Sequence, residues 1–368
     1  MELLRDVQVL ETGHGLAVGF AGRLLASLGA TVTRASGLGG PDPLALAPEG
    51  SAQHAIHGFL HEGKRVAPVA DEGAGMAKAV AGCAVWIDAR PAATIAGDPF
   101  SDAHRHGTGP AGLTHVAITP FGLDGPWRDK AGSGLVAAAA GGFLYLCGDA
   151  DREPLRNGGH LPEFQTGLFA ALGAIAGLLS TEMGRPGRLV DLSLLEAVIA
   201  FQERGDLAVT HLGRDLVRSR RHEGTHPFMV LPCRDGFCTI ATGTPRQWEA
   251  LAILIGKPEW AADPEFALNR LARADEIDAV LLPWLAERTA AEVTEALQGL
   301  RIAAGPVLTA SQVLDDAHLV ERGFFRSLGV AGRDLRVPGF PVRSGGERLD
   351  ARLLDAVAAE PRRPNGGN

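Results

Sequence analysis

The first 36 residues combine short apolar runs with glycine turns in a pattern that predicts a strand, a helix and a second strand. Residues 7–10 form an apolar run, a glycine turn follows, residues 21–28 are predicted to be helical, and residues 31–34 to be a strand. This order is typical of a βαβ unit, in which backbone N–H groups at the start of the helix can bind a phosphate. The same pattern is also typical of a tight turn that only packs the helix on the sheet.

Further apolar segments extend this alternation. Runs at 83–87, 114–119 and 189–192 predict three more strands, residues 132–146 predict a buried helix, and residues 162–181 predict a long one. Strands that alternate with helices in this way predict an α/β fold, with a Rossmann-like parallel sheet covered by helices on both faces.

The pattern changes near residue 224, where polar and apolar residues begin to alternate around a turn. Residues 228–241 predict a hairpin, and helices are predicted at 246–255, 274–286 and 289–299. We interpret this region as a smaller α+β domain. The predicted boundaries are a large α/β domain at 1–222, the small domain at 223–310, a return to the large domain at 311–359 and a disordered tail at 360–368.

Composition narrows the choice of partners. The chain is 46% apolar and 21% charged, which is ordinary for a soluble globular enzyme. Its net charge of −8 and its few aromatic residues disfavour a nucleic acid or an anionic membrane as partner. Four cysteines without Cys-x-x-Cys spacing favour a reducing cytoplasm and no metal site. The start of the chain lacks a signal-peptide pattern, and the longest apolar runs are interrupted by glycine.

The glycines of the first turn do not fit a nicotinamide dinucleotide site. Gly13, Gly15 and Gly19 place the third glycine one residue later than the Gly-x-Gly-x-x-Gly pattern requires. The second strand ends in Arg34-Ala-Ser36, without the carboxylate that would bind a ribose hydroxyl. A basic residue at this position favours a phosphate.

Seven segments, in order along nearly the whole chain, resemble the class III coenzyme A transferases. That family includes formyl-CoA and carnitine CoA-transferases and, as an offshoot, α-methylacyl-CoA racemase. The segments are VLETGHGLAVGFAGRLLASLGATVTRA at 9–35, GKR at 63–65, ITPFGLDGPW at 118–127, LPEFQTGLFAALGAIAGLL at 161–179, GRLVDLSLLEAV at 187–198, LPCRDGF at 231–237 and VLDDAHLVERGFF at 313–325. The resemblance implies that the βαβ unit binds coenzyme A. It also implies a homodimer of two ring-like chains threaded through each other, with active sites at the interface.

The resemblance also implies where the chemistry takes place. Family members carry a carboxylate at the start of the long helix, in a pattern like Leu-Ala-Asp-Tyr-x-x-Gly, which here is Leu161-Pro-Glu-Phe-Gln-Thr-Gly167. The family's carboxylate attacks an acyl-CoA thioester, passes through a mixed anhydride and becomes a thioester with CoA. Glu163 is therefore the expected nucleophile of an enzyme that moves CoA between an acyl-CoA and a small carboxylic acid. Coenzyme A is then substrate and covalent intermediate, and no permanently bound cofactor is expected.

The racemase branch is disfavoured. Its base includes a histidine in a Gly-His-Asp stretch about thirty residues before the carboxylate, and the corresponding stretch here is Gly132-Ser-Gly134. His160 lies three residues before Glu163, and we interpret it as a loop residue.

The resemblance implies a set of coenzyme A contacts in the βαβ turn, in a basic cluster and at the mouth of the site. They are Gly15, Leu16, Ala17, Arg34, Lys64, Arg65, Arg90, Phe121 and Gly122. The set is thinner than in the family, because the usual Val-Glu after the second strand is replaced by Ala35-Ser36. Phe121 and Gly122 have a second interpretation, as a loop at the carboxyl edge of the sheet.

Two alternatives to a transferase stay open at this point. The glutamate in place of aspartate and the thinned contacts also fit another enzyme on the same scaffold, one that processes an acyl-CoA or related thioester without the transferase intermediate. The other alternative is a binding or scaffold protein that has lost catalysis.

Overall fold

The structure is a computed structural model, and its described residues fall into two compact units. They are residues 3–38, 42–106, 108–110, 112–219, 221 and 224–349. The larger unit comprises the described residues of Met1–Tyr145, Arg156–Leu216 and His318–Asn368, and the smaller unit those of Leu146–Leu155 and Val217–Ala317. The tail predicted at 360–368 lies outside the described residues.

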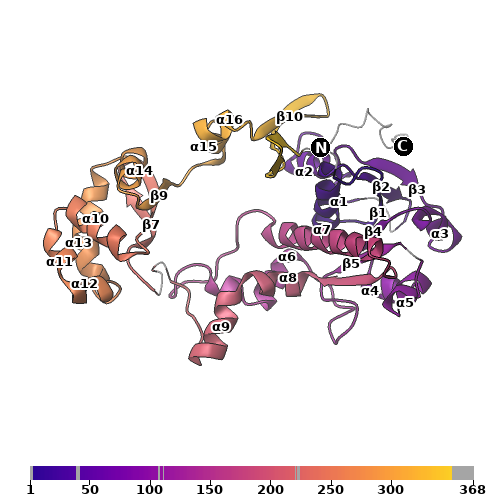
Figure 1. The fold of residues 1–368 in the computed structure, drawn as a ribbon, viewed down its shortest axis with the longest axis horizontal. Helices are drawn as coiled ribbons and strands as arrows, with labels where there is room; N and C mark the ends of the chain where they lie inside the picture. Colours follow the sequence, from indigo (N-terminus) through magenta and orange to yellow (C-terminus); the bar gives the residue numbers. More distant parts are fainter. Residues whose placement is uncertain are drawn as a thin grey trace, which may run out of the picture. The chain divides into compact units, whose positions relative to one another are not determined.

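A six-stranded parallel sheet forms the centre of the larger unit (Figure 1), in the order β3-β2-β1-β4-β5-β6. Each of its five strand pairings is parallel. The strands are β1 (Gln8–Gly13), β2 (Thr31–Ser36), β3 (Arg65–Pro68), β4 (Val85–Ala89), β5 (Thr114–Thr119) and β6 (Leu189–Ser193). The predicted parallel α/β fold is confirmed. The short edge strand β3 adds to the strands predicted from the sequence.

The two faces of this sheet carry separate apolar clusters because successive side chains of a strand point to opposite sides. Val9 and Ile87 face a cluster with helices α1 (Leu16–Ser27) and α7 (Leu161–Glu182). Leu10 and Trp86, their neighbours in the chain, belong to a second cluster. The central strands are thus covered on both faces, as parallel sheets require.

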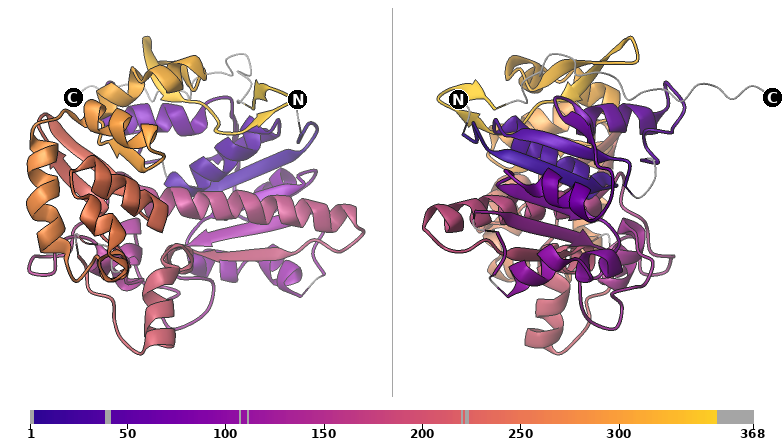
Figure 2. Two further views of the ribbon diagram at one scale, coloured as in Figure 1. Left: turned by 60° about the vertical axis from the view of Figure 1, so that its left-hand side comes forward. Right: turned by 90° about the vertical axis from the view of Figure 1, so that its right-hand side faces the viewer.

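Helices α1 and α7 pack against each other on the sheet (Figure 2). A Cβ atom on Gly167 would lie 2.7 Å from the carbonyl oxygen of Ala17, so only glycine permits this close crossing. Beside it, the rings of Phe20 and Phe164 meet edge to face with their centroids 4.6 Å apart. This contact fixes the start of α7 relative to the βαβ turn.

Two helix boundaries differ from the sequence prediction. Helix α1 begins at Leu16, directly after Gly15 with its φ of 128°, and not at residue 21 as predicted. The helix predicted at 132–146 is divided into α6 (Gly134–Ala140) and a short 3-10 turn, η1 (Leu144–Leu146). Gly142, with a φ of 79°, interrupts it.

The other elements of the larger unit lie around the sheet or extend its C-terminal part. They are α2 (Ala52–His61), α3 (Ala74–Val80), α4 (Ala92–Ala96), α5 (Pro99–Arg105), α8 (Leu194–Phe201), α9 (Glu203–Leu212), β10 (Phe325–Val330), β11 (Arg333–Pro338), β12 (Arg343–Ser344) and β13 (Glu347–Arg348). The β10–β11 hairpin packs on α2, where Arg326 pairs with Glu62. Residues after 318 therefore return to the unit that holds the N-terminal half.

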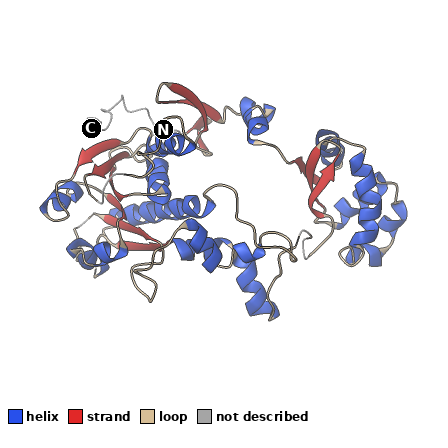
Figure 3. Ribbon diagram, turned by 180° about the vertical axis from the view of Figure 1, so that it is seen from behind, coloured by secondary structure: helices blue, strands red, loops and turns tan. Residues whose placement is uncertain are grey.

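In the smaller unit a layer of strands lies beside a layer of helices (Figure 3). The antiparallel strands are β7 (Phe228–Cys233), β8 (Gly236–Ala241) and β9 (Ala303–Pro306). The helices are α10 (Pro245–Leu254), α11 (Pro258–Ala262), α12 (Pro264–Leu268), α13 (Ala274–Ala286), α14 (Ala290–Gly299) and α15 (Ala310–Leu314), with α16 (Ala317–Glu321) at the boundary. The core is built on the stacked rings of Trp248, Trp260 and Phe266.

Candidate active site

Glu163 lies in the first turn of α7, where the helix leaves a glycine-containing loop. Pro162 occupies the first turn beside it, a position that suits proline because the N–H it lacks has no partner within the helix. The unpaired N–H groups at a helix start favour an ionised carboxylate. Glu163 is half-buried. The sequence thus places a half-buried carboxylate at the start of a long helix.

A pocket of about 190 Å³ opens around this carboxylate, and all of its lining residues belong to the larger unit. Leu135, Ala138 and Leu144 supply an apolar wall. The loop before α7 supplies polar groups, namely Arg156, Asn157 and His160. The pocket therefore combines one carboxylate, one guanidinium and an apolar side, which suits a small acid with an apolar backbone.

The carboxylate of Glu163 rests directly on the start of helix α6. A Cβ atom built on Gly134 would lie 2.3 Å from Oε1 and 2.4 Å from Oε2 of Glu163. The preceding residue, Ser133, caps α6 by accepting a hydrogen bond from the N–H of Val136 at 3.3 Å. The space next to the Gly134 α-carbon is therefore filled by the carboxylate.

Gly15, Leu16 and Ala17 are the expected coenzyme A contacts at the βαβ turn, and the space beside Gly15 is open. A Cβ atom on Gly15 would meet no other described atom within 4 Å. Leu16 is half-buried and Ala17 is buried at the start of α1, a helix of 12 residues. The turn can therefore present backbone N–H groups to an anion at this point.

Lys64, by contrast, lies inside the protein. Its ammonium donates to Glu11 Oε1 at 2.6 Å and to the carbonyl of Gly19 at 2.7 Å, and its side chain is fully buried. Burial lowers the pKa of Lys64 to about 8 and raises the pKa of Glu11. A Cβ atom on Gly22 would lie 1.6 Å from Glu11 Oε1. The pair joins β1 to α1 through space that a glycine leaves open.

Arg90 is held in a second buried network at the carboxyl end of β4. Its Nη2 lies 2.8 Å from Asp88 Oδ2 and 2.7 Å from Asp98 Oδ2. Asp88 also accepts a hydrogen bond from Thr12 at 2.8 Å. Burial opposes the ionisation of Asp88, but hydrogen bonds from His115 and Arg90 outweigh it and lower its pKa to about 2. The charge of Arg90 is therefore balanced by the chain's own carboxylates.

The two remaining basic residues of the expected cluster are nearer to solvent, and they lie on adjacent strands. Arg65 is exposed on β3, and Arg34 of β2 pairs with Asp42 at 3.1 Å. In the register of these strands Thr33 is opposite Arg65, so Arg34 points to the other face of the sheet. The structure brings Arg34 close to Lys64, whose pKa it helps to lower, but it does not bring Arg34 and Arg65 together.

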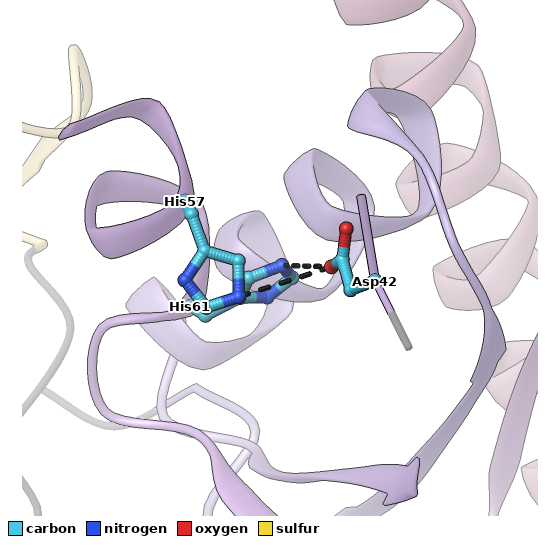
Figure 4. Close-up of side chains that lie close together, drawn as sticks. All are labelled: Asp42, His57 and His61. Carbon is cyan, nitrogen blue, oxygen red and sulfur yellow. Dashed lines mark ion pairs between the residues drawn. The ribbon is translucent and has the colours of Figure 1, made fainter. Parts of the chain in front are cut away.

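Asp42 also faces two histidines that the sequence analysis did not single out (Figure 4). Its Oδ2 lies 3.8 Å from Nε2 of His57 and 3.6 Å from Nε2 of His61, which are one turn apart on α2. The three side chains offer ligand atoms to a metal ion. However, the Arg34 guanidinium already binds Asp42, and the Lys64 ammonium lies 3.4 Å from His61 Nδ1. Two adjoining positive charges disfavour a cation here, and burial together with Lys64 lowers the pKa of His61.

Phe121 and Gly122 lie in the loop after β5, which supports the start of α6. The Phe121 ring packs edge to face on Trp127, and the Gly122 N–H donates to Thr119 Oγ1 at 2.9 Å. A Cβ atom on Gly132 would lie 2.4 Å from Pro120 and 3.0 Å from the Phe121 ring. This loop therefore lies against the residues that lead into Ser133 and Gly134. Neither Phe121 nor Gly122 is among the described residues that line the pocket around Glu163.

Sequence reasoning missed two features of the pocket. Arg156 lies in a polar loop and has no local pattern that marks it as a binding residue. Gly134 has no sequence signal beyond the absence of a histidine beside it, although its contact with Glu163 defines one side of the pocket. The His57-x-x-x-His61 spacing, in contrast, is visible in the sequence as a helical pair.

Comparison with known proteins places these residues in a family context. Residues 4–355 match the model of CoA-transferase family III. Succinyl-CoA–D-citramalate CoA-transferase from Chloroflexus aurantiacus is 30% identical over 337 residues, which cover 87% of this chain and 82% of that protein. Succinate–glutarate CoA-transferase from Agrobacterium fabrum is 25% identical, with 87% and 84% covered. The crystal structure of a CAIB/BAIF family protein from Brucella suis superposes with a TM-score of 0.76 at 26% identity, covering 95% of each chain.

Proposed function

This chain belongs to CoA-transferase family III and is an acyl-CoA transferase, and from that premise we propose that Glu163 carries its covalent intermediate. The observation that supports this role is the position of the carboxylate, at a helix start and within a pocket that can admit a small acid. Glutamate and aspartate carry the same nucleophile, and the pocket accommodates the longer side chain beside Gly134.

The proposed reaction exchanges CoA between two acids. An oxygen of Glu163 attacks the thioester carbon of the acyl-CoA and forms a new C–O bond. The C–S bond breaks, CoA leaves as a thiolate, and the acyl group remains on Glu163 as a mixed anhydride. The thiolate then attacks Cδ of Glu163 and releases the first acid as a carboxylate. The carboxylate of the second acid then attacks Cδ of the glutamyl-CoA thioester, releases the CoA thiolate and forms a second mixed anhydride. The thiolate attacks the acyl carbon of this anhydride, so that the new acyl-CoA leaves and the Glu163 carboxylate is restored. Each bond broken is matched by one formed, so the exchange needs neither water nor ATP.

We assign small dicarboxylic acids as the substrates. Arg156 lines the same pocket as Glu163, so one carboxylate of a diacid can pair with the guanidinium while the other reacts. The relatives cited above are named for succinyl, citramalate and glutarate substrates, all of which are dicarboxylic.

Coenzyme A itself is assigned to the βαβ unit. A Cβ on Gly15 would meet no described atom within 4 Å, which leaves room for a phosphate at the start of α1, and Arg65 supplies an exposed positive charge. Arg34 lies on the neighbouring strand, where it pairs with Asp42. Lys64 and Arg90 are balanced by buried carboxylates, so we assign them to holding the turn and the ends of the strands in place. Phe121 and Gly122 act through the loop that supports α6.

We further propose a homodimer. Five large apolar side chains of α7 and its end follow one helical face and are exposed, namely Leu161, Leu168, Leu172, Leu179 and Met183. Helix α7 has the length and apolar composition of a membrane span, and it is only partly buried, through the side that packs on α1 and the sheet. We propose that a second copy of this chain covers the exposed apolar face of α7.

Light scattering tests the homodimer. It is expected to give twice the mass of the chain, and Leu172→Asp is expected to weaken the assembly. A monomeric mass for the unaltered protein contradicts the proposal.

The cytoplasm is the proposed location. All four cysteines are thiols in the structure, which suits a reducing compartment.

Trapping of the intermediate tests the role of Glu163. Incubation with succinyl-CoA followed by hydroxylamine is expected to leave a hydroxamate on the peptide that contains Glu163, detected by its mass. Glu163→Gln should abolish both the trapped species and the exchange of CoA with glutarate. Glu182→Gln, at the exposed far end of the same helix, is the matched control. Full exchange by Glu163→Gln overturns the proposed mechanism and favours chemistry without this intermediate.

A further inference from the structure

We propose that Gly134 is a positioning residue whose missing side chain allows a glutamate to serve as the nucleophile in this chain. The inference rests on the proposed role of Glu163 and goes beyond it, because it assigns the geometry of that carboxylate to a residue on another helix. The two positions are separated by 29 residues in the sequence and meet at the starts of α6 and α7.

The contact is unusually direct. The three atoms nearest to a Cβ built on Gly134 are Oε1, Cδ and Oε2 of Glu163, at 2.3, 2.4 and 2.4 Å. Distances below 3 Å require one of the two groups to move. Any side chain at position 134 would therefore displace the carboxylate from its present place.

The backbone does not require glycine at this position. Gly134 is the first residue of α6 and has helical geometry, which every L-residue can adopt. Alanine is a better helix former than glycine. The need for glycine therefore comes from the space that Glu163 occupies and not from the conformation of the chain.

Side-chain length couples the two positions. Aspartate at 163 would end one methylene earlier, so its carboxylate would be drawn back from the α-carbon of residue 134 by roughly 1 Å. A methyl group at 134 would then have room. We infer that glutamate at 163 works with glycine at 134, whereas aspartate at 163 tolerates alanine there.

A double-mutant cycle tests this coupling with succinyl-CoA and glutarate as the substrates. Gly134→Ala is expected to lower kcat by about 100-fold, since misplacement of a reacting group by 1 Å costs that much, with KM for succinyl-CoA little changed. In the Gly134→Ala background, Glu163→Asp is expected to raise kcat by about tenfold. The matched control is Gly158→Ala, because a Cβ at Gly158 meets no described atom within 4 Å. It should keep the unaltered kcat.

Three readouts separate the possible failures. Thermal unfolding of Gly134→Ala is expected at the temperature of the unaltered protein or above it, so a loss of kcat is not a loss of folding. Unaltered kcat in Gly134→Ala, or effects of the two substitutions that simply multiply, overturns the inference. Hydroxylamine trapping in the unaltered protein separates this inference from the proposed function. If Glu163 is trapped but Gly134→Ala keeps its kcat, only the inference about Gly134 is wrong. If nothing is trapped on Glu163, the proposed role of Glu163 is wrong, and the inference that rests on it is wrong as well.

Discussion

Two groups of charged residues in the larger unit have similar composition but opposite surroundings. The pocket around Glu163 places a half-buried carboxylate and the exposed side chain of Arg156 on an open surface. The network around Lys64 and Arg90 places ammonium and guanidinium groups inside the protein, each within 3 Å of a carboxylate. The first group faces a pocket that can admit a ligand, whereas the charges of the second are balanced by the protein's own carboxylates.

This difference determines what each group contributes. A buried ion pair costs desolvation of both ions, and breaking it leaves an unbalanced charge in the interior. We therefore expect changes in the Lys64 and Arg90 network to affect folding, and changes in the Glu163 pocket to affect catalysis. The predictions below are arranged by the size of the effect.

The largest effect is expected from Glu163→Gln. The amide keeps the shape of the side chain but not the nucleophile, so kcat for CoA exchange should fall by about 10⁴-fold or more, which corresponds to about 5 kcal/mol in the barrier. Steady-state kinetics measure this fall. The free energy of unfolding should stay the same within 1 kcal/mol, as expected for a residue on an open pocket. A large loss of stability with little loss of kcat would mean that Glu163 contributes to folding and not to catalysis.

Glu11→Gln is expected to do the opposite. It removes the negative partner of the fully buried Lys64 ammonium, so the free energy of unfolding should fall by about 3–5 kcal/mol in urea titrations. Adding Lys64→Met should restore most of the loss, because the interior then holds no charge at this place. Asp129→Asn, in an exposed pair with Arg128, is the control and should leave unfolding unchanged. If Glu11→Gln and Asp129→Asn lower the free energy of unfolding equally, the buried ion pair does not differ from the exposed one in its effect on folding.

The free energy of unfolding at acid pH should depend on the ionisation of Asp88. The pKa of Asp88 is lowered from its ordinary value of 3.8 to about 2, so the unfolded chain binds this proton more readily than the folded one. Its contribution of about 2 kcal/mol is present above pH 3.8 and is lost as the pH falls toward 2. Unfolding free energies from pH 5 to 2 measure the slope, which should be shallower in Asp88→Asn. If the unfolding free energy has the same slope against pH in the unaltered protein and in Asp88→Asn, groups other than Asp88 cause the acid sensitivity.

The same contrast explains how much the sequence could predict. Periodicity locates β1, β2, β4, β5, β6 and α7, because central parallel strands and a long helix have strong local patterns. The start of α1 lies five residues before the predicted one, because the small residues after Gly15 resemble a turn as much as a helix. The sequence does not predict strand β3, because its four residues, Arg65–Pro68, begin within a basic pair and show no clear alternation.

The site was predictable to the extent that one residue determines its chemistry. Glu163 follows from the motif at the start of the long helix, and its role stays a prediction. The partner of Lys64 does not follow from local sequence, because Lys64 meets Glu11, 53 residues away, only through the arrangement of β1 and β3 in one sheet. A basic residue next to a strand looks the same in the sequence whether it faces a ligand or an internal carboxylate. Arg156 and Gly134 join the pocket through tertiary packing alone.

Arg156→Ala sharpens the comparison from the side of the pocket. Loss of the guanidinium should raise KM for glutarate by about 10- to 100-fold, since one charge-assisted contact is removed. KM for a monocarboxylic acid such as butyrate should stay the same, because its single carboxylate is used in the reaction. Arg185→Ala, an exposed arginine after α7, is the control. A rise in KM for both acids would show that Arg156 does not read the second carboxylate.

The smallest effect is expected for the basic residues near solvent. Arg65 is exposed, so its contact with a phosphate of coenzyme A is partly screened, and Arg65→Ala should weaken binding by about fivefold in calorimetry. The effect should shrink further when salt is raised, as a screened charge interaction requires. Lys78→Ala, an exposed cation on α3, should have no effect. Lys64→Met should reduce coenzyme A affinity only in step with stability, because that ammonium is bound to Glu11 and to Gly19. A strong, salt-dependent loss of affinity in a Lys64→Met protein that remains fully folded would show that Lys64 leaves its carboxylate for the ligand, and the separation between the two groups of charges would no longer hold.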